Sequence, residues 1–352
     1  MIKNHLILMI SFLIPALLLG CAATASPPLE PAAPHALAAD AQPVVIDTDM
    51  AADDWLAILY LLGRSDVDVR AVTVVGTGEA HCSAGTRNAR SLLALAGRPE
   101  IPVACGRETP LAGDHAFPSD WRKRVGNLLG LALPQNSSEA SGESAVELLA
   151  RIIKGSPQMV QLITLGPLTN VGEALEAEPG LVQKLGMITV MGGAIEAAGN
   201  VGPSLNIENE AAEWNIYVDP RAAGQVFASG VPLTLVPLDA TNDVPVTMDF
   251  YRRLEKDRTT PVAEFVYRVL AAQENNIRSG WTYFWDPLTA AVATEEGLAA
   301  FQEMSLSVVE EEGTDSGGTI ANEGGSTMRV AITADRERFE ALFLDAVNGR
   351  LP

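Results

Sequence analysis

Short apolar runs alternate with segments of helical periodicity along most of the chain. The runs are rich in β-branched residues, as buried strands are, and they cover 44–46, 69–75, 101–104, 159–165, 187–191 and 233–236. The segments that follow carry apolar residues three and four positions apart, as helices do, at 53–62, 88–95, 144–154, 170–175 and 221–228. Repeated units of strand, polar loop and helix predict an α/β fold with a mostly parallel sheet.

The last third of the chain predicts further helices and a final pair of strands. The strands are expected at 304–309 and 328–332, joined across the glycine-rich segment 313–325. Helices are expected at 251–254, 262–275, 281–288 and 336–347. We therefore expect residues 44–352 to form a single α/β domain, with a Rossmann-like, mostly parallel (mixed) central sheet and helices on both faces.

The first 43 residues are expected to lie outside this fold. Residues 1–21 have a positive start at Lys3, an apolar run over 6–19 and the ending Leu-Leu-Gly-Cys at Cys21, which resembles a bacterial lipoprotein signal peptide. An ordinary secretory peptide cleaved near residues 23–25 is the alternative. Residues 22–43 are rich in Ala and Pro and predict a flexible tether. The protein is thus expected to be exported to the bacterial cell envelope, lipid-anchored on the periplasmic or extracellular face, with no other membrane contact.

The net charge bears on the kind of partner, and the cysteine content bears on whether a disulfide can form. The 352 residues carry a formal net charge of −20. This charge argues against a nucleic-acid partner, because phosphate binding needs a basic surface. Cys82 and Cys105 could pair in an oxidising compartment, but the sequence does not show whether they are close enough.

Four carboxylates directly follow the first predicted strand. Asp47, Asp49, Asp53 and Asp54 fall within eight positions, and the last two lie in the first turn of the following helix. Carboxylates packed this densely repel one another unless a cation lies among them, and oxygen ligands favour Ca²⁺ or Mg²⁺. The alternative is a helix-capping aspartate with ordinary surface acids.

Other polar motifs also follow predicted strands. Because the carboxyl ends of parallel strands meet at one edge of a sheet, their loops should face one site. The motifs are Leu-Gly-Pro-Leu-Thr-Asn at 165–170, Met-Gly-Gly-Ala at 191–194, Gly-Asn at 199–200, Ala-Glu-Trp-Asn at 212–215 and Trp-Asp-Pro-Leu at 285–288.

The sequence Asp-Thr-Asp-Met-Ala-Ala-Asp-Asp at 47–54, together with these motifs in this order, resembles the nucleoside hydrolases. Met50 and Ala51 replace the Pro-Gly that is usual in that family. The resemblance implies hydrolysis of the N-glycosidic bond of ribonucleosides, with Asp49 as the catalytic base. It implies a Ca²⁺ cofactor held by Asp49, Asp54, Asp286 and the carbonyl of Leu165. It also implies ribose contacts from Asp53, Asn200, Glu213 and Asn215, and a homodimer or homotetramer.

Two other positions depart from the family pattern, and the second of them bears on the base. Thr77 replaces a common Asn, and Trp285 stands where many members carry a His that protonates the departing base. A purine-preferring branch has Trp at this place and a second Trp from a loop, and Trp121 lies in the long loop expected over 107–134. Stacking between Trp121 and Trp285 favours purine nucleosides. The group that protonates the base stays open between Glu79, Asp120 and solvent.

Two other functions remain possible at this point. A non-catalytic, lipid-anchored riboside-binding protein would need the same sugar and metal ligands, although it would not need Asp49 beside the metal. A pyrimidine-specific nucleoside hydrolase would keep the chemistry and change the base.

Overall fold

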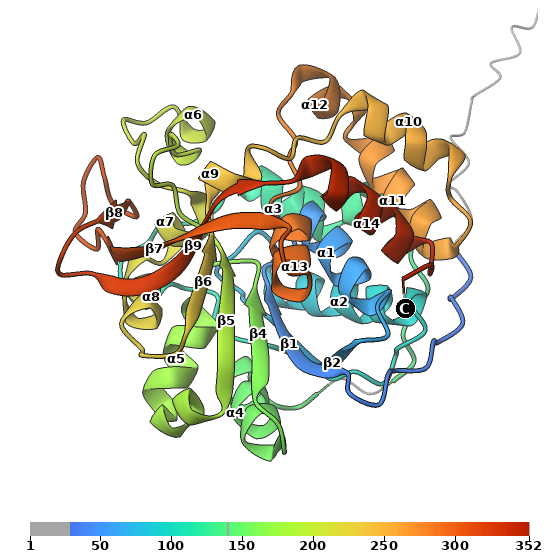
Figure 1. Ribbon diagram of the computed structural model, residues 1–352, viewed down its shortest axis with the longest axis horizontal. Coiled ribbons are helices and arrows are strands. Elements are labelled where there is room, and N and C mark those ends of the chain that lie inside the picture. Colours follow the sequence, from blue (N-terminus) through green and yellow to red (C-terminus); the bar gives the residue numbers. More distant parts are fainter. Residues whose placement is uncertain (1–28, 139–140, 352) are drawn as a thin grey trace, which may run out of the picture.

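A computed structural model describes residues 29–138 and 141–351. Nine strands form one sheet in the order β3-β2-β1-β4-β5-β6-β9-β7-β8 (Figure 1). The strands are β1 (Gln42–Thr48), β2 (Val67–Val74), β3 (Val103–Cys105), β4 (Val160–Thr164), β5 (Leu185–Met191), β6 (Leu233–Val236), β7 (Ala299–Val308), β8 (Thr319–Ala321) and β9 (Ser326–Ala334).

The sheet is parallel from β3 to β9 and antiparallel beyond it. β1 pairs in parallel with both β2 and β4, and β9 pairs in parallel with β6. β7 runs antiparallel to β9, and the short β8 adds an antiparallel edge strand between them in sequence. This arrangement confirms the predicted mixed sheet, and β8 is an element that the glycine-rich segment did not predict.

Helices cover both faces of the sheet and bury two separate cores. One core contains Val44 and Ile46 of β1 and the other contains Val45, so the two cores lie on opposite faces of the sheet, each covered by one group of helices. The first group is α1 (Ala52–Leu62), α2 (Cys82–Leu95), α10 (Met248–Lys256), α11 (Pro261–Ala272), α13 (Trp285–Thr294) and α14 (Arg336–Val347). The second is α4 (Ala145–Gly155), α5 (Thr169–Ala177) and α8 (Pro220–Phe227). The predicted fold class is therefore confirmed.

Shorter helices lie where the strands end. The segment expected as an open loop over 107–134 contains one of them, because Trp121 and Val125 find apolar neighbours there. These helices are α3 (Ser119–Gly126), α6 (Val201–Leu205), α7 (Trp214–Val218), α9 (Leu238–Thr241) and α12 (Glu274–Ser279). Two 3₁₀ turns, Leu128–Gly130 and Pro179–Gln183, complete the list.

The start of α13 differs from the prediction. A helix was expected from residue 281, but residues 282–284 lie along residues 244–246 and form backbone hydrogen bonds with them. The Thr282 carbonyl accepts from the Val246 N–H, and the Phe284 N–H donates to the Val244 carbonyl. The helix therefore begins at Trp285, which places Asp286 in its first turn.

The segment before β1 also differs from the prediction. The Ala32 N–H donates to the Leu95 carbonyl and the Ala38 N–H to the Ser65 carbonyl, while His35 Nε2 lies 3.0 Å from the Arg64 carbonyl. A free tether is therefore wrong for residues 29–43, which lie against the domain at the side where β2 and β3 begin. The expected signal peptide over 1–21, its Cys21 and the rest of the tether lie outside the described residues.

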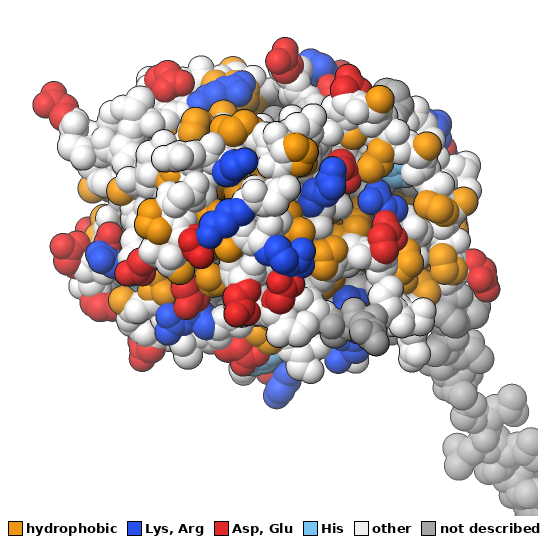
Figure 2. Space-filling view, turned by 90° about the horizontal axis from the view of Figure 1, so that it is seen from below, with side chains coloured by type: hydrophobic (Ala, Val, Ile, Leu, Met, Phe, Trp, Pro, Cys, Tyr) orange, Lys and Arg blue, Asp and Glu red, His pale blue; other side chains and the backbone are white. Residues whose placement is uncertain are grey.

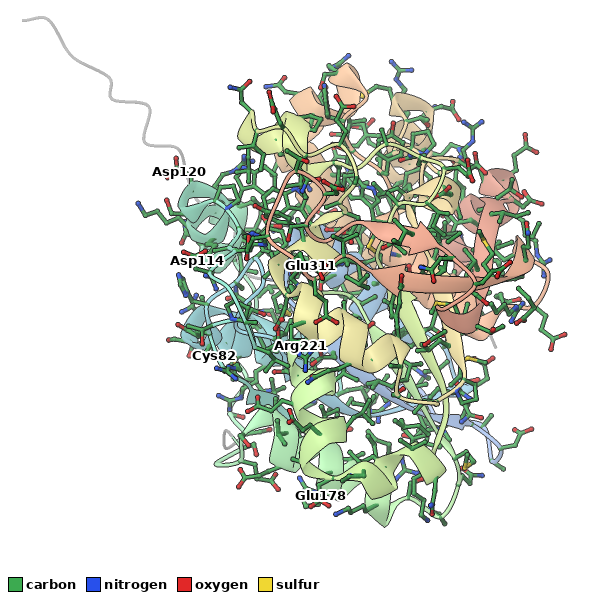
Figure 3. The ribbon with its side chains drawn as sticks, turned by 90° about the vertical axis from the view of Figure 1, so that its left-hand side faces the viewer. Cys82, Asp114, Asp120, Glu178, Arg221 and Glu311 are labelled. Atoms are coloured by element: carbon green, nitrogen blue, oxygen red, sulfur yellow. A yellow bond between two sulfur atoms is a disulfide. The ribbon has the colours of Figure 1, made fainter. Side chains whose placement is uncertain are left out.

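Cys82 and Cys105 form a disulfide with a Cα–Cα distance of 5.6 Å. The bond joins the first residue of α2 to the last residue of β3. Cys82 lies on the same side of the molecule as Asp114 and Asp120 of the segment 107–134 (Figure 3). The disulfide thus holds the loop that leads into α2 against the neighbouring strand.

The face seen from below mixes charges of both signs (Figure 2). The described surface also carries ion pairs such as Arg151–Glu143 at 2.7 Å and Lys154–Glu178 at 2.5 Å. Such a face offers no one-signed patch to a polyanion. Within the described residues, no helix is both long and apolar enough to cross a membrane.

Candidate active site

One cavity of about 750 Å³ opens at the end of the sheet where the parallel strands finish. Loops after β1, β2, β4 and β5 contribute to its wall, together with α3, α7 and the segment 273–286. Every site residue predicted from the sequence lines it: Asp49, Asp53, Asp54, Trp121, Leu165, Asn200, Glu213, Asn215, Trp285 and Asp286. The sequence motifs therefore meet at one place, as expected from the parallel topology.

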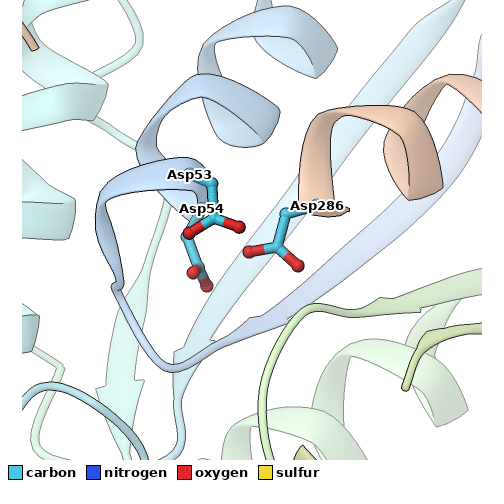
Figure 4. Close-up of side chains that lie close together, drawn as sticks. All are labelled: Asp53, Asp54 and Asp286. Atoms are coloured by element: carbon cyan, nitrogen blue, oxygen red, sulfur yellow. The ribbon is translucent and has the colours of Figure 1, made fainter. Parts of the chain in front are cut away.

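Three carboxylates converge at the base of this cavity. Asp53 and Asp54 come from the first turn of α1, and Asp286 comes from the first turn of α13 (Figure 4). One oxygen of each lies within 4.8 Å of the others. Asp286 does not cap its helix, since the N-cap position belongs to Phe284.

Asp54 is fixed by its neighbours through one oxygen only. Its Oδ1 accepts hydrogen bonds from the Thr48 hydroxyl, the Asp49 N–H at 3.1 Å and the Met50 N–H at 3.2 Å. Its Oδ2 is buried and has no hydrogen-bond partner among the described residues. An unpaired buried carboxylate oxygen is costly unless a cation or a proton meets it.

Burial raises the pKa of each carboxyl in this group. The pKa of Asp53 rises to about 7, through burial and then the charge of Asp49. Burial, followed by the charges of neighbouring carboxylates, raises the pKa of Asp54 and of Asp286 well above the usual range. Three mutually repelling oxygen ligands at this spacing fit a hard divalent cation, which would reverse these shifts.

Asp49 lies beside this group rather than in it. Its Oδ1 accepts from the Ala51 N–H at 3.0 Å and its Oδ2 from the Glu79 N–H at 3.1 Å. Burial raises its pKa to about 6. The group of three therefore contains Asp53, which was predicted to contact the ribose, in place of Asp49. The reason is that both oxygens of Asp49 turn toward backbone N–H groups.

Two glycines make room for Asp49. A Cβ on Gly78 would lie 2.0 Å from the Asp49 Cβ, and one on Gly166 would lie 2.6 Å from it. These glycines follow β2 and β4, the two neighbours of β1. The Asp49 side chain is thus held between the loops of three adjacent strands, with no space for a bulkier neighbour.

Met50 carries the turn between β1 and α1 in a left-handed conformation, with a φ of 62°. This conformation costs a non-glycine residue roughly 1–2 kcal/mol. The cost is offset by hydrogen bonds, because the Met50 N–H donates to Thr48 and Asp54, and its carbonyl accepts from the Trp55 indole at 2.9 Å. The turn that usually has Pro-Gly is therefore kept here by side-chain hydrogen bonds.

Polar residues of two loops line the other side of the cavity. Glu213 caps α7 and accepts from the N–H groups of Asn215 and Gly193, and burial raises its pKa to about 7. The Asn215 amide donates to the Met191 carbonyl at 3.2 Å. Asn200 Oδ1 is buried without a partner among the described residues. Glu213 is thus a buried cap and not a solvated acid.

Aromatic side chains form two walls of the cavity. The Trp121 ring centroid lies 5.4 Å from that of Trp214, and the Trp285 centroid lies 5.5 Å from that of Tyr283. Trp121 therefore both packs against another ring and faces the cavity. Trp281, which is 69% exposed, stands at the rim. Four of the five tryptophans of the chain line this one space.

Several lining residues were not predicted. Arg124 comes from α3, while Gln273 and Asn276 come from the region of α11 and α12. Glu79 also lines the cavity, and burial raises its pKa well above the usual range. The spacing of Trp121, Arg124 and Val125 is helical and could have placed Arg124 beside Trp121, had the segment been read as a helix.

Comparisons with known proteins all point to one family of enzymes. A family model described as "Inosine-uridine preferring nucleoside hydrolase" matches residues 44–341. A pyrimidine-specific ribonucleoside hydrolase, RihA of Klebsiella pneumoniae, is 36% identical over 229 residues, covering 64% of this chain and 70% of that protein.

Solved structures with this fold are also similar. A plant nucleoside hydrolase superposes with a TM-score of 0.78 at 29% identity, covering 87% of this chain and 99% of that one. A purine-preferring ribonucleoside hydrolase from Gardnerella vaginalis gives a TM-score of 0.76 at 28% identity, covering 88% and 99%.

Proposed function

The chain belongs to the inosine-uridine preferring nucleoside hydrolase family and is a hydrolase of nucleoside N-glycosyl bonds, and from this we propose that it is a Ca²⁺-dependent enzyme that favours purine ribonucleosides. Membership of this family decides against the riboside-binding protein without catalysis. The observation that carries the proposal is the group Asp53, Asp54 and Asp286, with its unpartnered oxygen, at the base of a cavity walled by aromatic rings.

In this proposal, carboxylates at the base of the cavity and the Leu165 carbonyl hold the cation. Asp54 and Asp286 are its ligands, and Asp49 or Asp53 completes the set. A bound Ca²⁺ would make a neighbouring water easier to deprotonate and would hold two adjacent ribose hydroxyls. Calcium takes six to eight oxygen ligands, more than the protein provides, so water and sugar oxygens would fill the remainder.

Asp49 is the residue that we propose for proton transfer. It accepts the proton of the attacking water, whose oxygen forms a bond to the anomeric carbon while the bond from that carbon to the base breaks. The electron pair of that bond leaves with the base, which then takes up a proton. Positive charge develops on the ribosyl group, and the surrounding carboxylates stabilise it.

The remaining polar residues would select and orient the sugar. Asn200 and Glu213 are proposed for the 5′-hydroxyl, Asn215 for the 3′-hydroxyl and Asp53 for the 2′-hydroxyl. The unpartnered Asn200 Oδ1 supports this assignment, because a hydroxyl would supply its missing donor. A site that pairs with ribose hydroxyls disfavours deoxy analogues, which leave buried groups unpaired.

The purine preference rests on the aromatic walls. Trp121 and Trp285 both face the cavity, which is large enough for a two-ring base. Stacking contributes about 1–3 kcal/mol for each base–ring contact. The solved purine-preferring enzyme with this fold lends support.

A pyrimidine preference is the second candidate. It is supported by the 36% identity to a pyrimidine-specific relative. Steady-state turnover of inosine, adenosine, uridine and cytidine separates the two, with reducing sugar as the product measured. A tenfold or greater preference for uridine or cytidine would overturn the purine proposal.

Metal dependence and the role of Asp49 are tested with the same assay. A calcium-selective chelator should remove turnover, and Ca²⁺ should restore it better than Mg²⁺ does. Asp49→Asn should lower kcat at least 100-fold while the circular dichroism spectrum stays unchanged. Turnover that survives exhaustive chelation would refute the metal proposal, and an Asp49→Asn variant with near-normal kcat would refute the base.

We further propose that the protein is exported, lipid-anchored at Cys21 in the bacterial cell envelope, and a homodimer or homotetramer. The first proposal rests on the resemblance of residues 1–21 to a lipoprotein signal peptide. Mass spectrometry of the mature N-terminus tests the anchor, and a cleavage near residue 23 without lipid would overturn it. Sedimentation of the purified protein tests the oligomeric state, with a monomer as the contrary result.

A further inference from the structure

Arg124 is the single positively charged side chain among the described residues that line the cavity. The same wall carries six carboxylates: Asp49, Asp53, Asp54, Glu79, Glu213 and Asp286. Arg124 is exposed, and none of the described residues forms an ion pair or a hydrogen bond with its guanidinium. A cation left free at the wall of an otherwise acidic cavity is available to a ligand.

The helix α3 places Arg124 in the cavity wall beside Trp121. Trp121, Arg124 and Val125 are spaced by three and four positions, so they share one face of α3, and all three line the cavity. Their neighbour Arg122 donates instead to the Gly76 carbonyl. Arg124 therefore stands one helical turn beyond Trp121, one of the rings proposed to stack on the base.

Arg124 also lies close enough to Glu79, another residue of the cavity wall, for its charge to act on that carboxyl. Burial raises the pKa of Glu79, as do the charges of Asp49 and Asp53, whereas the charge of Arg124 lowers it. Glu79 in turn donates its N–H to Asp49, the residue proposed for proton transfer. The residues proposed for the 5′ end of the sugar, Asn200 and Glu213, come from other loops.

We propose that Arg124 is a specificity-determining residue that donates hydrogen bonds to the exocyclic oxygen of a 6-oxopurine, so that the enzyme prefers inosine and guanosine to adenosine. This inference rests on the proposed purine nucleosidase function. A guanidinium has donors only, and position 6 offers an acceptor in hypoxanthine and guanine but a donor in adenine.

The neutral amides of the cavity wall do not make the same distinction. Gln273 and Asn276 line the cavity with amides that both donate and accept, so they can face either an oxo or an amino group. The guanidinium also stabilises negative charge that spreads onto the exocyclic oxygen as the glycosidic bond breaks. The discrimination therefore depends on Arg124.

The test compares Arg124→Ala and Arg124→Lys with wild type, and uses Lys123→Ala as the matched control. Lys123 is the exposed neighbour on α3 that does not line this cavity. The readouts are kcat/KM for inosine, guanosine and adenosine, and the affinities of hypoxanthine and adenine measured by calorimetry. Circular dichroism establishes that each variant is folded.

We expect wild type to prefer inosine and guanosine at least tenfold. Arg124→Ala should lose about 10- to 100-fold of kcat/KM on these two and less than threefold on adenosine. Hypoxanthine affinity should fall in parallel, Arg124→Lys should recover part of the loss, and Lys123→Ala should change nothing.

Two results would overturn the inference. An equal loss of kcat/KM on all three nucleosides would mean that Arg124 acts on a feature that they share. No loss of kcat/KM would mean that Arg124 does not contact the base. If no nucleoside is hydrolysed at all, the proposed function fails, while the hypoxanthine and adenine affinities still decide the role of Arg124.

Discussion

Asp53→Asn should stabilise the protein when no metal is present. Asn has the same shape and cannot ionise, so it removes one charge from the group that Asp53 forms with Asp54 and Asp286. The oxygens of this group lie within 4.8 Å of one another, and at that limit two unit charges repel by about 3.5 kcal/mol at an effective dielectric constant of 20. The pKa of Asp53, raised from 3.8 to about 7, corresponds to about 4 kcal/mol. Water in the cavity reduces both values, so we expect about 2–4 kcal/mol.

The effect must depend on pH in one direction. The pKa of Asp53 is higher in the folded protein than in the unfolded chain, so the folded state binds more protons between about pH 4 and pH 7. The free energy of unfolding of the metal-free wild type therefore falls as the pH rises through this range. The variant lacks this contribution. Its advantage should be absent near pH 4 and complete above pH 7.

Urea unfolding followed by tryptophan fluorescence measures this difference, with a chelator and with Ca²⁺, at pH 4.5 and pH 8. With Ca²⁺ the order should reverse, because the wild type gains binding energy that the variant has partly lost. Asp114→Asn, at an exposed position outside the cavity, is the control and should change stability by less than 0.5 kcal/mol. A variant that is less stable than wild type at pH 8 in chelator would refute the reasoning.

The other predictions concern the surroundings of this group. Gly78→Ala should lower kcat at least 100-fold, because its Cβ would displace the carboxylate that it packs against, whereas Gly155→Ala has nothing within 4 Å and should keep full activity. Equal activity of the two variants would contradict this. Replacing Cys82 and Cys105 by Ser opens a link over 23 residues and should lower the free energy of unfolding by about 3 kcal/mol in a denaturant titration, with an unchanged midpoint as the contrary result. Trp121→Ala should raise KM for inosine about tenfold in steady-state assays, and an unaltered KM would show that the ring does not contact the base.

The sequence predicted the fold correctly where whole strands are buried. The strands β1, β4, β5 and β6 are buried nearly throughout, so their apolar runs were visible in the chain. The start of α4 was also predicted, because Ser144 and Glu147 form a capping box that depends on local residues only.

The sequence failed where tertiary contacts decide the structure. α3 buries only Val125 fully, and it is held by the contact between Trp121 and Trp214, which are distant in sequence. Its polar composition therefore predicted a loop, and because no helix was expected, the sequence did not show that Arg124 lines the cavity. Similarly, the order of the aspartates in the sequence does not reveal whether Asp49 or Asp53 points an oxygen toward Asp54 and Asp286. That choice depends on the N–H groups of Ala51 and Glu79.

The segment 29–41, which lies along the start of β2 and β3, bears on the orientation that the proposed anchor would give the enzyme. The chain enters the domain at the end of the sheet where the strands begin, whereas the cavity opens at the end where they finish. In a protein fastened to a bilayer through its N-terminus, the mouth of the cavity would point into the surrounding fluid. Nucleosides would then arrive by free diffusion, and the released base and ribose would depart without first meeting lipid headgroups.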